Sequence, residues 1–326
     1  MSKSNNITTQ PLLLADLGAT NARFALLDHE GQACSAVLRA ADYPSLAAAT
    51  QAFLGQHEAR GRPKHGAFAV AAPVVGDLVT FTNLPWRFSI RDLQSALDFE
   101  RLDVINDFAA IALGLPLLGT TDRRQIGPGT PEAGAAVAVL GPGSGLGVSG
   151  LLPGPGGGTI ITGEGGHVTM APCNDRENAV LTVLRHQLGH VSAEQVISGP
   201  GLVALYQALS VLDDRPAPSM TAADITAAAL TGSPSICLDA LHLFTAFLGT
   251  VAGNLALTLG ARGGVYIAGG IVPQLGDFLD RSAFRHRFTD KGRHSGAYLT
   301  PIPTYLITHP RPAFLGLRAR LRASVP

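Results

Sequence analysis

The chain has 326 residues, enough for two domains of ordinary size that each bury their own core. Its 24 Lys and Arg balance its 24 Asp and Glu, so no net charge draws it towards nucleic acid or an anionic membrane. The three cysteines, Cys34, Cys173 and Cys237, form no C-x-x-C pair, which argues against a disulfide framework or a structural zinc site. We therefore expect a cytoplasmic protein that acts on a small molecule and binds no nucleic acid.

Two uncharged stretches are long enough to be considered as membrane spans. Residues 133–163 are interrupted by prolines and many glycines, which one continuous spanning helix does not tolerate. Residues 243–261 approach spanning length, but they contain Asn254 and several threonines and glycines. We interpret this second stretch as a buried helix and predict no membrane association.

The first two predicted strands are joined by a turn of small and polar residues. The turn and its flanks contain Asp16, Gly18, Thr20, Asn21 and Arg23. Such a turn lets backbone N–H groups approach a phosphate tail, while the carboxylate faces a hydrated cation. Ordinary hairpins show the same pattern, so these residues alone leave both interpretations open.

The next elements alternate between strands and helices. Strands are predicted at 33–38, 65–70, 77–81 and 102–105, and helices at 43–54 and 89–97. Pro44 would open the first helix, and Ser89 with Asp92 three residues later forms a capping pattern for the second. The alternation is typical of an α/β fold.

The strand at 102–105 leads directly into Asn106 and Asp107 at the start of a helix. Because the positive end of the helix dipole stabilises an ionised carboxylate, we expect Asp107 to be exposed and charged at neutral pH. This position suits a base that accepts a hydroxyl proton as a phosphoryl group arrives, with Asn106 donating to the same substrate. A helix N-cap without a catalytic role is the alternative.

A second strand–turn–strand unit begins with a strand at 135–140, and its turn contains Gly143, Ser144 and Gly145. The glycine spacing resembles a dinucleotide fingerprint, but a strand follows where that fingerprint requires a helix. We predict instead a second phosphate-binding hairpin, with the Ser144 hydroxyl on the outer phosphates. The repeated unit indicates two related α/β lobes with a cleft between them.

Glu164 and His167 follow a strand at 159–162 and lie in a loop dense with glycines. A carboxylate and an imidazole can bind the hydroxyls of one small polar ligand. They could also hold a metal, but no H-E-x-x-H or similar ligand spacing surrounds them. Polyol binding is the interpretation that we favour over a metal site, and a surface turn is the alternative without function.

The rest of the chain is mainly helical. Helices are predicted at 177–188, 201–212, 221–230 and 315–322, and strands at 265–268 and 304–307. The strand at 265–268 ends in Gly269 and Gly270, and Thr221 is a favourable N-cap.

Together these segments resemble the bacterial glucokinase family, ATP-dependent hexose kinases with the two-lobed actin/hexokinase-like (ribonuclease H-like) ATPase fold. The resemblance spans almost the whole chain. It rests on residues 16–23, 105–108, 141–147, 163–167, 191–194, 198–202 and 263–273. The Glu-Gly-Gly-His element ending at His167, together with Asn106-Asp107, is specific for sugar kinases of this kind, whereas the glycine turns are shared across the superfamily.

The resemblance implies transfer of the ATP γ-phosphoryl group to O6 of glucose, with Asp107 as the general base. The remaining sugar hydroxyls would be bound by Asn106, Glu164, His167 and Glu194. The first phosphate element would comprise Asp16, Gly18, Thr20, Asn21 and Arg23. Gly143, Ser144 and Gly145 would form the second element, and Gly269 and Gly270 would lie against adenosine. Asp16 would act on the hydrated Mg²⁺ that ATP carries.

The resemblance also implies a small α/β domain at 1–117, completed by the C-terminal helix at about 308–326, and a large α/β domain at 118–307. A homodimer is expected from the family and from the apolar stretch at 243–261. The family usually has Gly where this chain has Ala19, which would make a left-handed backbone costly there. Two alternatives remain: a kinase for another hexose, and a non-catalytic actin-like nucleotide switch that would not need Asn106-Asp107.

Overall fold

The computed structural model describes residues 11–28, 33–81, 84, 86–216, 218–232, 235–292 and 295–323. The chain divides into two compact units. Unit 1 consists of Met1–Leu118, Gly154–Ile160 and Pro310–Pro326, and unit 2 of Gly119–Pro153 and Ile161–His309. The α/β class predicted from the sequence is confirmed, with a mixed sheet as the framework of each unit.

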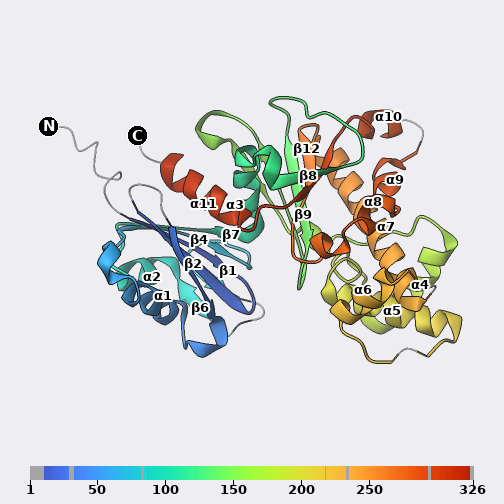
Figure 1. Ribbon diagram of the computed structural model, residues 1–326, viewed down its shortest axis with the longest axis horizontal. Coiled ribbons are helices and arrows are strands. Elements are labelled where there is room, and N and C mark those ends of the chain that lie inside the picture. The colour runs from blue at the N-terminus through green and yellow to red at the C-terminus, as the bar shows by residue number, and fades with distance from the viewer. Residues whose placement is uncertain are drawn as a thin grey trace. The chain divides into compact units, whose positions relative to one another are not determined.

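Unit 1 is built on a five-stranded mixed sheet (Figure 1). In spatial order its strands are β3 (Ala33–Arg39), β2 (Asn21–Leu27), β1 (Leu12–Leu17), β4 (His65–Val70) and β7 (Arg101–Asn106). β1 pairs antiparallel with β2, to which a short turn joins it, and parallel with β4, which follows after a helical crossover. A separate hairpin is formed by β5 (Leu78–Thr80) and β6 (Arg87–Ser89).

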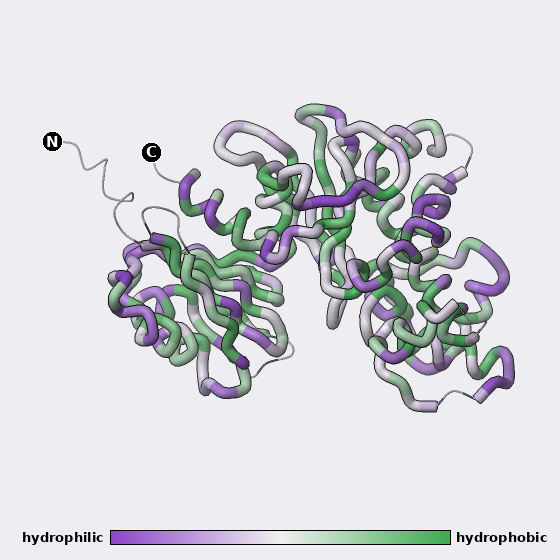
Figure 2. The backbone as a smooth tube through the Cα atoms, in the orientation of Figure 1, coloured by the Kyte–Doolittle hydropathy of each residue, from purple (hydrophilic) through white to green (hydrophobic). Residues whose placement is uncertain are grey.

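Helices cover both faces of this sheet (Figure 1). They are α1 (Leu46–Gly55) and α2 (Ile90–Ala96) on one face, and α3 (Asp107–Gly114) and α11 (Pro312–Ala323) on the other. Because side chains alternate along a strand, Leu13 packs towards α1 whereas Leu14 packs towards α11. Both leucines are almost completely buried, and β1, β2 and β4 run mostly in the hydrophobic colour in Figure 2.

α11 packs against α3 at backbone contact distance. A Cβ atom on Gly316 would collide with the Ala110 carbonyl, and one on Gly114 would lie 2.7 Å from the Pro312 carbonyl. Glycine is needed at both positions because any side chain would push the helices apart. The helix that begins at Asp107 is therefore held in place by the C-terminal helix.

Unit 2 repeats the strand arrangement of unit 1. In spatial order its sheet contains β11 (Thr159–Thr162), β10 (Leu146–Leu152), β9 (Val137–Pro142), β12 (Gly264–Ile267), β13 (Thr304–Ile307) and β8 (Arg123–Ile126). β9 pairs antiparallel with β10 and parallel with β12, as β1 does with β2 and β4. The repeat predicted from the two strand–turn–strand segments is thus present in the sheet topology.

The helices of unit 2 form one large apolar core with a face of its sheet. They are α4 (Asp175–Leu188), α5 (Gly199–Asp213), α6 (Ala222–Leu230), α7 (Ile236–Leu259), α8 (Phe278–Arg281), α9 (Phe284–Thr289) and α10 (Ser295–Leu299). Within the described residues α7 is the helix long and apolar enough to cross a membrane, but most of it is buried in this core. The interpretation of 243–261 as a buried helix is confirmed.

A buried ion pair ties α4 to α9. Both guanidinium Nη atoms of Arg287 donate to the Glu177 carboxylate, and Nη2 also donates to Thr250 Oγ1 at 2.8 Å. Glu177 is 1% exposed, so these bonds offset the cost of removing its charge from water.

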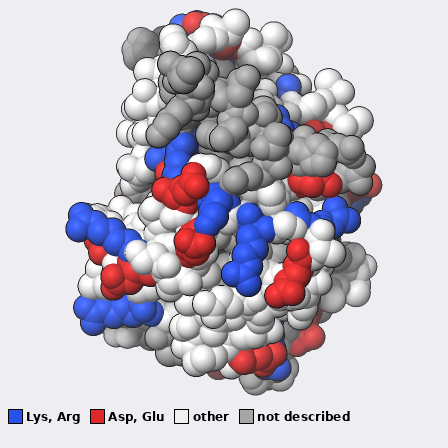
Figure 3. Space-filling view, turned by 90° about the vertical axis from the view of Figure 1, so that its left-hand side faces the viewer, with Lys and Arg blue, Asp and Glu red and all other residues white. Residues whose placement is uncertain are grey.

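Exposed charges of both signs are interspersed on the face shown in Figure 3, and they do not gather by sign. In unit 1, for example, Arg60 lies 3.3 Å from Asp28 and Arg23 lies 3.5 Å from Asp16. The balanced composition is therefore expressed as local pairs of opposite charge.

Helix starts show where the sequence interpretation needed correction. The helix predicted from residue 43 begins at Leu46, because the Ser45 side chain accepts a hydrogen bond from Ala48 N and caps it, leaving Pro44 outside. Ser89 and Thr221 are N-caps as predicted, accepting from Asp92 N and Asp224 N.

Candidate active site

The parallel strands of unit 1 bring two carboxylates to the same edge of the sheet. β1 and β7 both pair with β4, and the registers place Asp16 opposite Ala69 and Asn106 opposite Val70. The carboxyl ends of parallel strands meet at one edge, so Asp16 on β1 lies near Asp107 at the start of α3. The two acids are 91 positions apart in the chain and are brought together only by this register.

Asp107 is held by the capping bonds of α3. The side chain of Asn106 is the N-cap, with Oδ1 accepting from Phe108 N at 2.9 Å and Ala109 N at 3.2 Å. Its Nδ2 donates to Asp107 Oδ1 at 2.9 Å, and Phe108 N donates to the same oxygen, also at 2.9 Å. Because both donors meet at Oδ1, Oδ2 is the more basic oxygen of Asp107.

The protonation of Asp107 differs from the sequence expectation. Burial, followed by the negative charge of Asp16, raises the pKa of Asp107 to about 7, although bonds from Phe108 and Asn106 act in the opposite direction. The prediction of an exposed, fully charged carboxylate is therefore wrong. Asp107 is half-buried, and the helix terminus does not outweigh desolvation and the second carboxylate.

Asp16 has a cation beside it. Arg23, opposite Asp16 in the β1–β2 pairing, places Nη1 3.5 Å from Asp16 Oδ2. Burial raises the pKa of Asp16, and the Arg23 charge lowers it. Both side chains retain some exposure, 27% for Asp16 and 42% for Arg23, so each can reach a ligand at the sheet edge.

The turn between β1 and β2 closes without a left-handed residue at Ala19. Gly18 N donates to the Asn21 carbonyl at 3.0 Å, and the exposed Thr20 accepts from Ala40 N through its carbonyl at 2.9 Å. Among described non-glycine residues, positive φ angles occur at Asp98 and Asp214 and not at Ala19. The conformational cost anticipated at Ala19 does not arise.

The turn between β9 and β10 is short, and its tip is exposed to solvent. Gly143 N donates to the Gly145 carbonyl at 2.8 Å, and Ser144 is exposed at the tip. The second glycine turn lies directly beside it: Gly269 has φ +87°, and a Cβ atom there would collide with the Pro142 carbonyl. Gly270 faces open space, because a Cβ atom at that position would have no neighbour within 4 Å. The structure therefore brings the two predicted nucleotide turns of unit 2 together.

The start of α5 joins these turns, a feature to which the sequence interpretation assigned no role. Gly199 N donates to the Gly143 carbonyl at 2.8 Å, and Ser198 caps the helix by accepting from Gly201 N. The positive end of the α5 dipole is thus beside the hairpin. The signal was present in the sequence, because Ser-Gly-Pro-Gly is a typical helix start with Pro in its first turn.

Glu164, His167 and Glu194 form one exposed cluster in unit 2. His167 Nε2 lies 3.9 Å from Glu164 Oε2, and its Nδ1 lies 4.0 Å from Glu194 Oε1. Two acceptors around an imidazole can bind vicinal hydroxyls, which is the chemistry predicted for them. Nowhere in the described part of the chain do three metal-ligating side chains gather at metal-binding distance.

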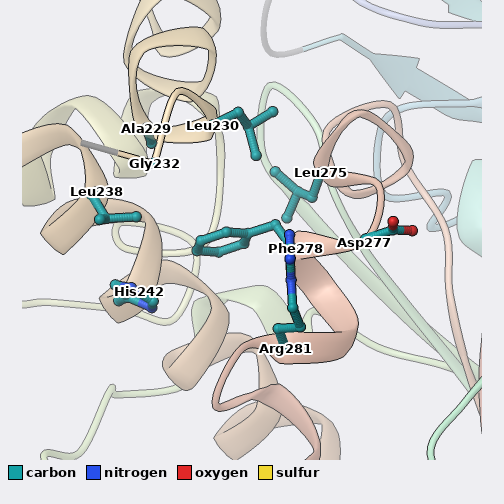
Figure 4. Close-up of a pocket in the computed structure, with 9 residues that line it drawn as sticks. All are labelled: Ala229, Leu230, Gly232, Leu238, His242, Leu275, Asp277, Phe278 and Arg281. Atoms are coloured by element: carbon teal, nitrogen blue, oxygen red, sulfur yellow. The ribbon is translucent and has the colours of Figure 1, made fainter. Parts of the chain in front are cut away.

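A pocket of about 530 Å³ in unit 2 is lined by none of the predicted site residues. It lies between the end of α6, the start of α7 and α8 (Figure 4). The Phe278 ring points towards Leu238 and His242 of α7, whereas the Asp277 carboxylate points away from that ring. The predicted sugar and phosphate residues of unit 2 therefore lie outside this pocket, at exposed turns.

Comparison with known proteins identifies the family. The glucokinase family model matches residues 13–324. The chain is 50% identical to a glucokinase of Paramagnetospirillum magneticum over 95% of its own length and 97% of that protein, and 49% identical to a glucokinase of Aromatoleum aromaticum over 96% and 95%. The crystal structure of a glucokinase from an Antarctic psychrotroph has 36% identity and a TM-score of 0.85, covering 97% of this chain and 99% of that one.

Proposed function

The chain belongs to the glucokinase family, enzymes that phosphorylate glucose with ATP, and we propose that Asp107 is the general base of this reaction. The observation that carries the proposal is a half-buried carboxylate with a pKa of about 7 and one oxygen fixed by two donors. A base whose pKa lies near the working pH combines a useful ionised fraction with a useful driving force for proton transfer.

In the proposed reaction Asp107 Oδ2 accepts the proton of the glucose 6-hydroxyl. The oxygen O6 forms a bond to the γ-phosphorus of ATP while the bond to the bridging oxygen breaks, giving glucose 6-phosphate and ADP. The bonds from Asn106 and Phe108 to Oδ1 keep the carboxylate from rotating. Asn106 therefore positions the base through one Nδ2 hydrogen. Its second Nδ2 hydrogen makes a long bond of 3.5 Å to the Ala72 carbonyl, and we propose that a sugar hydroxyl takes the place of that carbonyl.

Glu164, His167 and Glu194 are proposed to bind hydroxyls of glucose. Carboxylates accept from hydroxyl donors, and the imidazole either donates or accepts depending on its tautomer. Because a sugar that lacks one hydroxyl leaves its partner without a hydrogen bond in the complex, such a site discriminates against that sugar. Family membership supports glucose as the acceptor.

We propose that the backbone of two hairpin turns binds ATP phosphates. The first contributes Gly18, Thr20, Asn21 and Arg23, and the second contributes Gly143, Ser144 and Gly145. Gly269 and Gly270 are proposed to lie against adenosine. The start of α5 beside Gly143 supports the second turn, because helix N-termini favour phosphate.

Asp16 is proposed to hold Mg²⁺ through water. The residues fit this ion: Mg²⁺ commonly takes one or two carboxylates, several waters and substrate phosphates, and needs no cluster of protein ligands. Asp16 and Asp107 are two acids at one sheet edge, and Asp16 keeps 27% exposure. When bound, Mg²⁺ would neutralise charge on the transferring phosphates.

We further propose the domain boundaries 1–117 with 308–326, and 118–307, a cytoplasmic location and a homodimer. The division into two compact units supports boundaries close to residues 118 and 309, although it groups Gly154–Ile160, inside the proposed large domain, with unit 1. Family membership supports the location and the dimer. Sedimentation of the purified protein tests the dimer, which a monomer at micromolar concentration would contradict.

A coupled assay for ADP formation tests the function as a whole. The purified protein is given ATP and Mg²⁺ with glucose, mannose, fructose or N-acetylglucosamine. In a parallel experiment polyphosphate replaces ATP, and the formation of sugar phosphate is measured in place of ADP. We expect ADP formation that depends on glucose. A higher kcat/KM with another sugar would identify a different hexose kinase, and no stimulation by any sugar would favour a nucleotide switch without kinase activity.

A further inference from the structure

Glu194 makes a hydrogen bond that a sugar ligand alone would not need. Its Oε2 accepts from Leu146 N at 2.8 Å, and Leu146 is the first residue of β10, directly after the turn containing Gly143, Ser144 and Gly145. A Cβ atom on Gly145 would collide with the same carboxylate oxygen. The hairpin therefore has a glycine where the Glu194 carboxylate must enter.

The backbone of Glu194 is bonded to the loop that carries His167. Glu194 N donates to the Gly166 carbonyl at 2.8 Å. Gly166 in turn packs on the hairpin, because a Cβ atom there would collide with the Leu146 carbonyl. Leu146, Gly166 and Glu194 thus hold one another, and these contacts connect the proposed phosphate turn to the proposed sugar loop inside a single unit.

The second oxygen of Glu194 points to the sugar side. Oε1 lies 4.0 Å from His167 Nδ1, and the side chain is 33% exposed. A hydroxyl that donates to Oε1 would restrict the side chain to the conformation in which Oε2 bonds Leu146 N. The first ligand to bind then bears the entropic cost of ordering the carboxylate, and the second ligand binds a side chain that is already ordered.

We propose that Glu194 is a positioning residue that couples sugar binding to ATP binding through Leu146 N. The inference rests on the proposed function, because it takes the sugar loop and the hairpin as the binding sites. Sugar on Oε1 fixes the hairpin in the form that accepts phosphates, and phosphates on the hairpin fix Oε1 for sugar. Such coupling is reciprocal, so each ligand raises the affinity for the other by the same factor.

The coupling factor is measured by calorimetry with a non-hydrolysable ATP analogue. The Kd of AMP-PNP with Mg²⁺ is determined without glucose and with saturating glucose, and the glucose Kd is determined without and with AMP-PNP. For the wild type we expect both ratios to be equal and at least about fivefold. A ratio of one would overturn the proposal.

Variants separate the two oxygens of Glu194. In Glu194→Gln the amide oxygen still accepts from Leu146 N, and the NH2 group that replaces Oε1 can donate to the oxygen of the sugar hydroxyl. Sugar would then still order the side chain, so we expect weaker glucose binding, because a charged acceptor is lost, with the ratio kept. Glu194→Ala loses both contacts, and Gly145→Ala displaces the carboxylate without changing it, so in both the ratio should fall to about one. A variant that only weakens AMP-PNP binding would raise the AMP-PNP Kd by the same factor without and with glucose, and the ratio of the two Kd values would not change.

Glu164→Ala is the matched control. Glu164 lies near His167, but among the described residues its side chain forms no hydrogen bond with the hairpin, so its loss should weaken glucose binding and preserve the ratio. A ratio that survives in Glu194→Ala and Gly145→Ala, or that is lost equally in Glu164→Ala, would overturn the inference. Failure of the proposed function would look different, because the wild type would then bind no glucose and form no sugar-dependent ADP.

Discussion

The β1–β2 hairpin of unit 1 and the β9–β10 hairpin of unit 2 occupy corresponding places in a five-stranded and a six-stranded sheet, yet they differ in chemistry. In each, the first strand pairs antiparallel with the second and parallel with a later strand. The first hairpin has an acid and an arginine at its edge, Asp16 and Arg23. The second has glycines, and its acid, Glu194, comes from a separate segment.

The two turns also differ in how closely other atoms approach them. At Gly18 a Cβ atom would find the Asn21 carbonyl at 3.7 Å, an ordinary contact. At Gly145 and Gly269 it would collide with Glu194 and with Pro142. The same hairpin backbone thus occurs twice. In unit 1 the charged side chains decide what the hairpin can bind, and in unit 2 the close approach of other atoms to its glycines does so.

The largest expected effect is a loss of turnover from a substitution in unit 1 that leaves nucleotide binding unchanged. Asp107→Asn keeps an oxygen that accepts from Asn106 and Phe108 but cannot accept the sugar proton, so kcat should fall by about 10²-fold or more. Steady-state kinetics measures kcat, and calorimetry with AMP-PNP should give an unchanged Kd. Turnover near that of the wild type would remove Asp107 from its role.

The second prediction concerns stability at the glycines of the two turns. Gly269→Ala places a Cβ at φ +87° and against the Pro142 carbonyl, so the free energy of unfolding should drop by about 2–4 kcal/mol. Gly18→Ala, the matched variant in the other hairpin, should change it by less than about 1 kcal/mol, because its φ is ordinary and the space is open. Urea denaturation measures both, and equal losses would contradict the contrast between the turns.

The third prediction separates affinity in unit 2 from chemistry in unit 1. Glu164→Gln replaces a charged acceptor by a neutral amide, so KM for glucose should rise by about tenfold while KM for ATP changes little. Initial rates at varied glucose and varied ATP provide the comparison. An equal rise in both KM values would argue against Glu164 as a sugar ligand.

Much of this arrangement could be predicted from the sequence, because it depends on local patterns. The strand–turn–strand repeats, the caps at Ser89 and Thr221 and the gathering of Glu164 with His167 follow from periodicity, turn chemistry or short spacing. The bond from Leu146 N to Glu194 spans 48 positions, and Asp16 reaches Asp107 only through the shared register with β4. No local signal reports such contacts, which is why the ionisation of Asp107 was predicted wrongly.

The smallest expected effect is a shift along the pH axis, and it tests that long-range pair. Since Asp107 must be ionised to accept a proton, kcat/KM for glucose at limiting ATP should fall below about pH 7, tenfold per pH unit. Asp16→Asn removes a charge that raises the pKa of Asp107, so NMR of the carboxyl carbon in the free protein should show Asp107 titrating at lower pH. If kcat/KM of the wild type began to fall only near pH 4, this result would contradict the assignment of Asp107 as the general base.

The same pKa predicts a pH dependence of folding with a definite sign. The folded-state pKa of Asp107 is raised above its ordinary value, so the folded protein binds a proton that the unfolded chain releases between about pH 4 and 7. The resulting stabilisation is fully present below that window and is lost as the pH rises through about 7. Asp107→Asn carries no such proton, so the difference in unfolding free energy between wild type and variant should change across this window and be constant above it. A constant difference from pH 4 to 8 would show that unit 1 does not hold Asp107 near neutrality, and the contrast between an acidic edge in one unit and a glycine edge in the other would then lose its electrostatic basis.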